Sequence, residues 1–236
     1  MITKETFQRY NRQILIPEIG IQGQTKIQAA KVLVVGAGGL GCPVLQYLAA
    51  AGVGTIGIID FDTVALHNLH RQLLHKEESI GCAKVTSALE HLKSLNSNPH
   101  YNIYQAALST DNIMPIVGAY DIIVDGSDNF ATRYLVNDTC VALGKPLVYG
   151  SILNFEGQMA VFNQAGSKNL RDLFPQPPDA EAVPDCDSNG VVGTLPGIIG
   201  TMMAQETIKM IVGMPVLRNE LLLFQTRNWR LQKINF

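Results

Sequence analysis

The chain has 236 residues, of which 47% are apolar and 16% are charged. This composition excludes an intrinsically disordered protein, because the chain has enough apolar surface to form a core. The 18 Lys and Arg residues against 20 Asp and Glu give a net charge of -2. Proteins that hold nucleic acid by its phosphates usually carry a basic excess, so a nucleic-acid partner is not expected.

The sequence contains no uninterrupted apolar run of 18 residues, and its N-terminus lacks the apolar segment of a secretion signal. No C-x-x-C pair occurs among the four cysteines, which are Cys42, Cys82, Cys140 and Cys186. Such cysteine usage favours a reducing compartment and argues against a disulfide framework or a zinc ribbon. We therefore expect a cytoplasmic protein without a membrane segment.

The first predicted elements are helices at 4–15 and 23–30. They precede a short apolar run at 31–35 that ends in glycines and indicates a buried strand. A helix at 40–51 and a second strand at 55–60 follow. A strand, a glycine turn, a helix and a strand thus fit into about 30 residues, which predicts a right-handed parallel unit.

The alternation of helices and strands continues to residue 150. It comprises helices at 84–95 and 131–143 and strands at 101–106, 121–125 and 147–150. A further strand at 158–162, an apolar helix at 194–212 and a hairpin of 220–225 with 228–234 complete the chain. The predicted class is α/β, with a Rossmann-like, mainly parallel sheet, flanking helices and a C-terminal antiparallel hairpin.

Residues 164–190 differ from the rest of the chain. They hold four prolines, five acids and two bases, with few apolar residues. Long loops of this kind usually serve as functional lids or are disordered. We interpret the whole chain, 1–236, as one domain with N-terminal helices at 4–30, a nucleotide-binding core at 31–150 and a third part at 151–236.

A phosphate-binding loop is indicated by the G-x-G-x-x-G string at 36–41, which follows a predicted strand and precedes a helix. Its glycines allow a tight turn, and the helix N-terminus favours a bound anion. Asp60 ends the second strand, where it can accept hydrogen bonds from ribose hydroxyls. The alternative is a tight turn with a capping Asp and no nucleotide. By itself this loop favours a nicotinamide enzyme.

Cationic and acidic residues at the same predicted sheet edge argue against a dehydrogenase. H-N-L-H-R-Q at 67–72 follows the second strand, Lys84 begins a helix, and S-D-N at 127–129 follows another strand. Taken singly, the bases are interpretable as solvated charges and the acid as a helix cap. Taken together they favour ATP, because attack on a triphosphate requires charge neutralisation at the α-phosphate and on the leaving pyrophosphate.

Eight motifs carry a resemblance to a known family: R-Y-N-R-Q at 9–13, G-A-G-G-L-G-C at 36–42, I-D-F-D at 59–62, N-L-H-R-Q at 68–72, G-C-A-K at 81–84, D-G-S-D-N at 125–129, E-G-Q at 156–158 and D-C-D-S-N-G-V-V-G-T-L-P-G-I-I-G at 185–200. With these the chain resembles the bacterial sulfur-carrier adenylyltransferases. That family includes molybdopterin-synthase adenylyltransferase and its thiazole-biosynthesis counterpart, and it is related to the ubiquitin-activating enzymes.

The resemblance implies ATP- and magnesium-dependent adenylation of the C-terminal glycine carboxylate of a ubiquitin-like sulfur carrier, in molybdopterin or thiamin biosynthesis. Pyrophosphate is released, and residues 151–236 would bind the carrier. A sulfurtransferase or a cysteine desulfurase is a further implied partner. The reaction needs no general base, because the carboxylate is ionised at pH 7.

The resemblance also implies roles for individual residues. Phosphates and ribose would be bound by Gly36, Gly38, Gly39, Gly41 and Asp60. The nucleotide would also be contacted by Asn68, Arg71, Gln72 and Lys84, and magnesium would be held by Asp128, with Asn129 beside it. Arg12 resembles an arginine that reaches the active site of the opposite subunit, which implies a homodimer. The catalytic set is thus Arg12, Arg71, Lys84 and Asp128, with Cys186 as a further candidate.

Two positions depart from the family pattern or leave alternatives open. Many relatives bind zinc with two C-x-x-C pairs, but Asn169 and Asp172 stand at the first pair, so no zinc is expected. In relatives a cysteine at the position of Cys186 can form a covalent link to the carrier or to a sulfur-donor protein. Alternatively, Cys186 is a loop cysteine without essential chemistry. The flanking Asp185 and Asp187 favour the latter, because neighbouring anions raise a thiol pKa.

Other candidate sites are disfavoured. Cys42, Cys82 and Cys140 are most simply small packed residues. His67, His70 and His75 lack the spacing and the partner ligands of a metal site.

Three alternative functions remain. Relatives of similar architecture activate a carboxylate on a modified tRNA base, a substrate that favours a basic surface, whereas this chain has a net charge of -2 and no run of Lys and Arg. A non-catalytic scaffold is disfavoured, because every matched polar position is filled. A nicotinamide dehydrogenase is favoured by the glycine loop alone.

Overall fold

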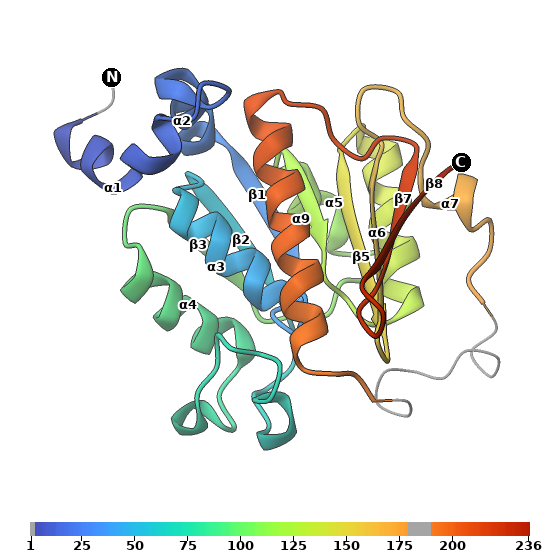
Figure 1. Ribbon diagram of the computed structural model, residues 1–236. Coiled ribbons are helices and arrows are strands. Elements are labelled where there is room, and N and C mark those ends of the chain that lie inside the picture. Colours follow the sequence, from blue (N-terminus) through green and yellow to red (C-terminus); the bar gives the residue numbers. More distant parts are fainter. Residues whose placement is uncertain (1–2, 179–189) are drawn as a thin grey trace.

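A computed structural model describes residues 3–178 and 190–236 of the chain. Its centre is an eight-stranded sheet in the order β3-β2-β1-β4-β5-β6-β7-β8 (Figure 1). The strands from β3 to β5 pair in parallel and those from β5 to β8 pair in antiparallel fashion. The strands are β1 Lys31–Val35, β2 Thr55–Ile59, β3 His100–Tyr104, β4 Ile122–Asp125, β5 Leu147–Leu153, β6 Glu156–Phe162, β7 Glu220–Gln225 and β8 Arg230–Asn235. The predicted fold class is confirmed.

Helices cover both faces of the parallel part of the sheet (Figure 1). One face packs against α3, α4 and α9, and the other against α5 and α6. The helices are α1 Lys4–Ile14, α2 Gly20–Ala29, α3 Gly41–Ala51, α4 Lys84–Leu95, α5 Ile113–Gly118, α6 Phe130–Leu143, α7 Leu170–Leu173 and α9 Thr194–Val212. Among the helices of the described ranges, none has the length and apolar character needed to cross a bilayer.

Strand β1 is buried on both faces of the sheet, which explains why its sequence is a continuous apolar run. Val32 and Val34 belong to the core beneath α3 and α9, whereas Leu33 and Val35 belong to the core beneath α6. Successive side chains of a strand point to opposite faces, so burial of both faces requires apolar residues at every position. At the edge of the sheet, β8 is exposed along its whole length and carries polar residues.

The strand order creates a topological switch point between β1 and β4. From β1 the chain passes to β2 on one side, whereas β4 lies on the other side. In such sheets ligands bind in the crevice at the carboxyl ends of the diverging strands. The turns that follow β1 and β4 approach each other closely here. Gly36, after β1, has φ +89, and a Cβ on it would come 3.1 Å from the carbonyl oxygen of Gly126, after β4. This geometry requires glycine.

The structure also differs from the sequence-based expectations. Helix α5 was not predicted, because it is only six residues long and contains Pro115. Helix α7 lies inside the expected loop at 164–190. Strands β5 and β6 each reach further, to a tight turn at Asn154, which has φ 54. Cys42 and Cys140 are buried as predicted, but the prediction is wrong for Cys82, which is exposed in the turn before α4.

Candidate nucleotide-binding site

A pocket opens at the carboxyl ends of β1, β2 and β4, where the switch point predicts a ligand. Most of the residues predicted from sequence line it: Gly36, Gly38, Gly39, Asp60, Arg71, Gln72, Lys84, Asp128 and Asn129. Three predicted residues, Gly41, Asn68 and Arg12, are not part of the lining. Cys186 lies outside the described residues.

The glycine loop joins β1 to the N-terminus of α3. A Cβ on Gly41 would lie 1.8 Å from the carbonyl oxygen of Gly36, so this glycine allows the loop and helix to pack and does not face the pocket. Gly38 and Gly39 do line the pocket. The N-terminus of α3 therefore lies beside these glycines, and its positive dipole end favours a bound phosphate there.

Asp60 braces the glycine loop from the end of β2. Its Oδ2 accepts a hydrogen bond from the backbone N–H of Ala37 at 2.8 Å, and its Oδ1 accepts one from Asp62 at 2.8 Å. The residue is 9% exposed and borders the pocket. Each carboxylate oxygen accepts more than one hydrogen bond, so these contacts leave acceptor capacity for a ribose hydroxyl.

Lys84 is the first residue of α4, as predicted, but it is not a solvated surface charge. Its side chain is 7% exposed, and Nζ lies 2.9 Å from Oδ2 of Asp62. The backbone N–H of Lys84 also donates to the carbonyl of Asp62. A buried ammonium is costly unless it is paired, so this ion pair keeps a positive charge at the pocket wall.

The segment between β2 and α4 divides into residues that face the pocket and residues that shape the turn. Arg71 lines the pocket and donates from Nη1 to the carbonyl of His67 at 3.1 Å. Gln72 is 3% exposed, and its Oε1 accepts no hydrogen bond from the described residues. Asn68 is buried and accepts from the backbone N–H of Ala65 at 3.0 Å, so here it stabilises a turn and does not reach the pocket.

Asp128 and Asn129 have different tasks in the structure. Oδ1 of Asn129 accepts from the backbone N–H of Thr132 at 2.9 Å and caps α6. The interpretation of Asp128 as the helix cap is therefore wrong, and its exposed carboxylate lies at the pocket.

The described ranges contain no cluster of three His, Cys, Asp or Glu side chains suited to a metal. Magnesium usually takes one or two carboxylates and completes its shell with water and substrate phosphates. The single carboxylate of Asp128 fits a magnesium ion carried by a nucleotide, and it would hold the ion from the protein side.

Sequence reasoning missed two buried ionisable residues here: Arg133, which lines the pocket, and Asp125, at the end of β4. Arg133 in α6 is 5% exposed, donates to the carbonyl of Ser127 from Nε and Nη2, and donates from Nη1 to Oγ of Ser151 at 2.8 Å. Asp125 ends β4, and burial raises its pKa despite the nearby Arg133. The signal was present, since Arg133 lies one helical turn after the capping Asn129 and so returns to the same loop.

Arg12 lies at the far end of the molecule from the pocket. Its neighbour Tyr10 packs on Gly52 at the C-terminus of α3 and accepts a hydrogen bond from Asn96, the residue that caps the C-terminus of α4. The pocket lies at the N-termini of the same two helices. Eleven residues of α3 span about 16 Å, so Arg12 does not reach the pocket of its own chain.

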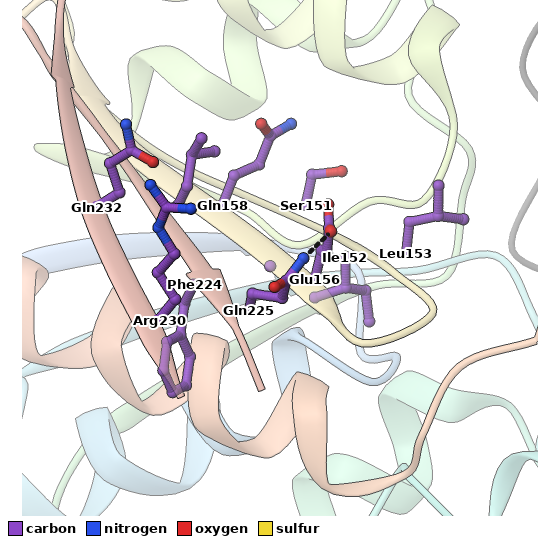
Figure 2. Close-up of a pocket in the computed structure, with 11 residues that line it drawn as sticks. Ser151, Ile152, Leu153, Glu156, Gln158, Phe224, Gln225, Arg230 and Gln232 are labelled. Atoms are coloured by element: carbon purple, nitrogen blue, oxygen red, sulfur yellow. Dashed lines mark hydrogen bonds between the residues drawn. The ribbon is translucent and has the colours of Figure 1, made fainter. Parts of the chain in front are cut away.

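A second pocket of about 350 Å³ lies on the antiparallel part of the sheet (Figure 2). Side chains from β5, β6, β7 and β8 line it, among them Gln158, Arg230 and Gln232, and Gln225 donates to Glu156 near the hairpin turns (Figure 2). Ile152 lines this pocket and the pocket at the switch point alike. The two pockets are therefore neighbours along β5.

At Asn169 and Asp172, where the resemblance placed a zinc-binding pair of the family, the structure shows a helix cap. The side chain of Asn169 accepts from the backbone N–H of Arg171, and Asp172 accepts from the backbone N–H of Asn169, which together form a capping box at α7. Tyr134 ties the following residues down by donating to the carbonyls of Phe174 and Gln176. The described part of the predicted loop is thus ordered by hydrogen bonds.

Comparison with known proteins agrees with this geometry. The model of the ThiF family matches residues 10–236. The chain belongs to the ThiF family. It is 54% identical over 217 residues to the "adenylyltransferase and sulfurtransferase MOCS3" of Culex quinquefasciatus, covering 92% of this chain and 50% of that protein. It is 48% identical over 216 residues to the "sulfur carrier protein adenylyltransferase" of Thermus thermophilus, covering 89% of this chain and 80% of that protein.

The chain spans about half the length of the MOCS3 relatives that it matches. Among solved structures, that of E. coli MccB with MccA-N7isoASN superposes with a TM-score of 0.85 at 21% identity, covering 98% of this chain and 72% of that one. At this identity the match supports the fold of the ThiF-family chain and not a shared substrate.

Proposed function

We propose that this ThiF-family chain is an ATP-dependent adenylyltransferase that activates the C-terminal carboxylate of a small ubiquitin-like sulfur carrier protein. The observation that carries the proposal is the convergence of a glycine loop, a buried ammonium and an exposed carboxylate in one pocket at the switch point. The activities for which the two relatives above are named support the same chemistry. A dehydrogenase would not need Arg71, Lys84 and Asp128 beside its dinucleotide.

In the proposed reaction a carboxylate oxygen of the carrier attacks the α-phosphorus of ATP. A bond forms between that oxygen and phosphorus, the bond from phosphorus to the bridging oxygen of the β-phosphate breaks, and pyrophosphate leaves. The carboxylate is already ionised, so no side chain has to remove a proton. The protein contributes position and charge: the glycine loop holds the phosphates, and Arg71 and Lys84 neutralise charge that develops on them.

Magnesium, held by Asp128 together with the nucleotide phosphates, would supply further charge neutralisation. Asp60 would bind the ribose while it braces the glycine loop. Gln72 would use its unpaired Oε1 to hold a hydrogen-bond donor of the ligand or a bound water. This assignment gives the buried acceptor the partner that the described residues lack.

The second pocket supports a path for the carrier tail. It adjoins the nucleotide pocket at Ile152, and its polar rim suits the backbone of an extended peptide. Sulfur would reach the activated carrier from a sulfurtransferase or a cysteine desulfurase. Whether the carrier belongs to the molybdopterin or the thiamin pathway would depend on the surface around this pocket.

We further propose a homodimer in which Arg12 completes the site of the partner subunit. Its distance from the pocket of its own chain supports action in trans. Apolar side chains exposed on and next to α1 support a subunit contact there. They are Phe7, Leu15, Ile16 and Ile21.

Exchange of radiolabelled pyrophosphate into ATP tests the proposed function. Exchange is expected only when magnesium and a carrier with its terminal glycine are both present. A carrier shortened by that glycine is the matched control and should support none. Exchange that is independent of any carrier, or that requires tRNA in place of a carrier protein, would contradict the proposal.

A further inference from the structure

His75 lies beneath the glycine loop, although it does not line the pocket. It is 6% exposed and sits between β2 and α4 in the chain. Its Nε2 lies 2.9 Å from the carbonyl oxygen of Ala37, and its Nδ1 lies 2.9 Å from Oγ of Ser87 in α4. One imidazole ring therefore connects the glycine loop to the helix that begins at Lys84.

The two contacts determine which ring nitrogen carries the hydrogen. A carbonyl oxygen only accepts hydrogen bonds, so Nε2 must donate to Ala37. In the neutral ring Nδ1 then accepts from the hydroxyl of Ser87. Burial lowers the pKa of His75 from its ordinary value of 6.5, so the neutral ring is the form present at pH 7.

The Ala37 residue is held from both ends. Its N–H donates to Asp60, and its carbonyl accepts from His75 and, at 3.4 Å, from Sγ of Cys42. In a trans peptide the carbonyl of one residue and the N–H of the next point in opposite directions. Because the Ala37 carbonyl is held toward the interior, the N–H of Gly38 is directed toward the pocket that Gly38 lines.

We propose that His75 is a positioning residue for the nucleotide, because it holds the Ala37–Gly38 peptide in the orientation that presents the Gly38 N–H to a phosphate. The inference rests on the proposed function in taking that phosphate to belong to ATP. Ser87 lies three residues after Lys84 and so on the same side of α4. His75 thus fixes the position of the glycine loop relative to α4, the helix that carries Lys84.

Two amide substitutions separate the two contacts of the ring. The amide nitrogen of Gln occupies roughly the place of Nε2, whereas that of Asn occupies roughly the place of Nδ1. His75→Gln therefore retains a donor for Ala37 and loses the Ser87 contact, and His75→Asn does the reverse. Calorimetric titration with Mg-ATP measures affinity without requiring turnover, and thermal unfolding shows whether each variant folds.

We expect His75→Asn to raise the Kd for Mg-ATP about 10-fold, as the loss of one buried hydrogen bond would. The Kd of His75→Gln should stay within about 3-fold of wild type. The Kd of Ser87→Ala should lie between these two values, because without the Ser87 hydroxyl fewer molecules carry the ring hydrogen on Nε2. Leu74→Ala is the matched control: Leu74 is a buried neighbour, so its loss should lower the Tm and leave the Kd unchanged. In exchange assays the KM for ATP should rise in His75→Asn, whereas the KM for the carrier should not.

Equal ATP affinity in folded His75→Asn and wild type would overturn the inference. So would His75→Gln binding as weakly as His75→Asn, because the Ala37 contact would then not be the determinant. If His75→Asn does not fold, Ser87→Ala decides: an affinity equal to that of wild type overturns the proposal. If wild type shows no carrier-dependent exchange while the variants keep the expected order of ATP affinities, the proposed function fails and the role of His75 stands.

Discussion

Lys84 and Asp62 form an ion pair of unequal exposure at the wall of the pocket at the carboxyl ends of β1, β2 and β4. Nζ of Lys84 lies 2.9 Å from Oδ2 of Asp62, and the lysine side chain is 7% exposed whereas the aspartate side chain is 48% exposed. The buried member of the pair depends on its partner more than the exposed member does. In the free protein Asp62 occupies the place that a phosphate would take beside Lys84 in the proposed complex.

Asp62→Asn is expected to destabilise the free protein by about 1–3 kcal/mol, between the values typical of exposed and buried pairs. Mg-ATP should recover part of this loss, because the phosphate replaces the missing negative charge. Thermal unfolding with and without Mg-ATP measures both effects. Glu78→Gln is the control, since its pair with Lys76 is exposed on both sides and its loss should change little. A Tm rise with Mg-ATP no larger than that of wild type would contradict this account of Lys84.

Asp128→Asn is expected to lower the rate of carrier-dependent exchange by at least about 100-fold at saturating magnesium, while the fold survives. The physical reason is the loss of the carboxylate proposed to hold magnesium, an effect of several kcal/mol at the transition state. Helix α6 keeps its cap, because Asn129 provides it. Asp111→Asn, at another exposed acid, is the matched control. Near-wild-type exchange by Asp128→Asn would remove Asp128 from the site.

Arg12→Ala and Lys84→Ala are each expected to be inactive alone and to complement each other when mixed. A mixed dimer contains one site with Lys84 from one subunit and Arg12 from the other. After full exchange of subunits, half of the dimers are mixed, so about a quarter of wild-type activity should return. Native mass spectrometry verifies the exchange. If mixed dimers form and remain inactive, Arg12 does not act across the interface.

His75 predicts a loss of stability in mild acid. Its pKa in the folded state is lowered, chiefly by burial; Lys84 and His91 also lower it, while Asp60 and the Ala37 carbonyl raise it. The folded state thus binds a proton less readily than the unfolded state, whose histidine titrates near 6.5. The stability that the neutral ring contributes is present above that pH and is lost as pH falls below it.

Urea unfolding between pH 7.5 and 5.5 measures this dependence. As pH is lowered, the unfolding free energy of wild type should decrease more steeply than that of His75→Gln, because the variant has no titrating ring at this position. The pKa of His91 is also lowered. His91→Gln is therefore the control, and it should remove only the part of the pH dependence of the unfolding free energy that His91 contributes. Parallel curves for wild type and His75→Gln would show that His75 does not titrate in this range.

Cys186→Ser is expected to leave pyrophosphate exchange within about 3-fold of wild type, because adenylation requires only a carboxylate and ATP. Any defect should appear in the later transfer of sulfur to the carrier, followed by mass spectrometry of the carrier C-terminus. A folded, ATP-binding variant that no longer exchanges pyrophosphate would assign Cys186 to the first step.

The sequence alone predicted the edge of the sheet at which the pocket lies, because local signals there coincide. An apolar run buried on both faces marks β1, the glycines mark the loop, and the helix start at Lys84 marks α4. Most residues chosen from these signals line one pocket in the structure. Parallel topology explains this success, since the residue that follows any buried parallel strand arrives at the same sheet edge.

Tertiary structure decided how these residues divide the work. Asn68, predicted as a ligand, stabilises a turn, and Asn129 caps α6 in place of Asp128. Arg133 lines the pocket and donates to the carbonyl of Ser127, and His75 contacts the glycine loop from beneath. Motif spacing places a residue along the chain, but the partner of a buried polar group is set by whichever unpaired atom the packing brings within about 3 Å. For His75 that choice depends on the assembled layers, because its partners Ala37 and Ser87 lie 38 and 12 residues away along the chain.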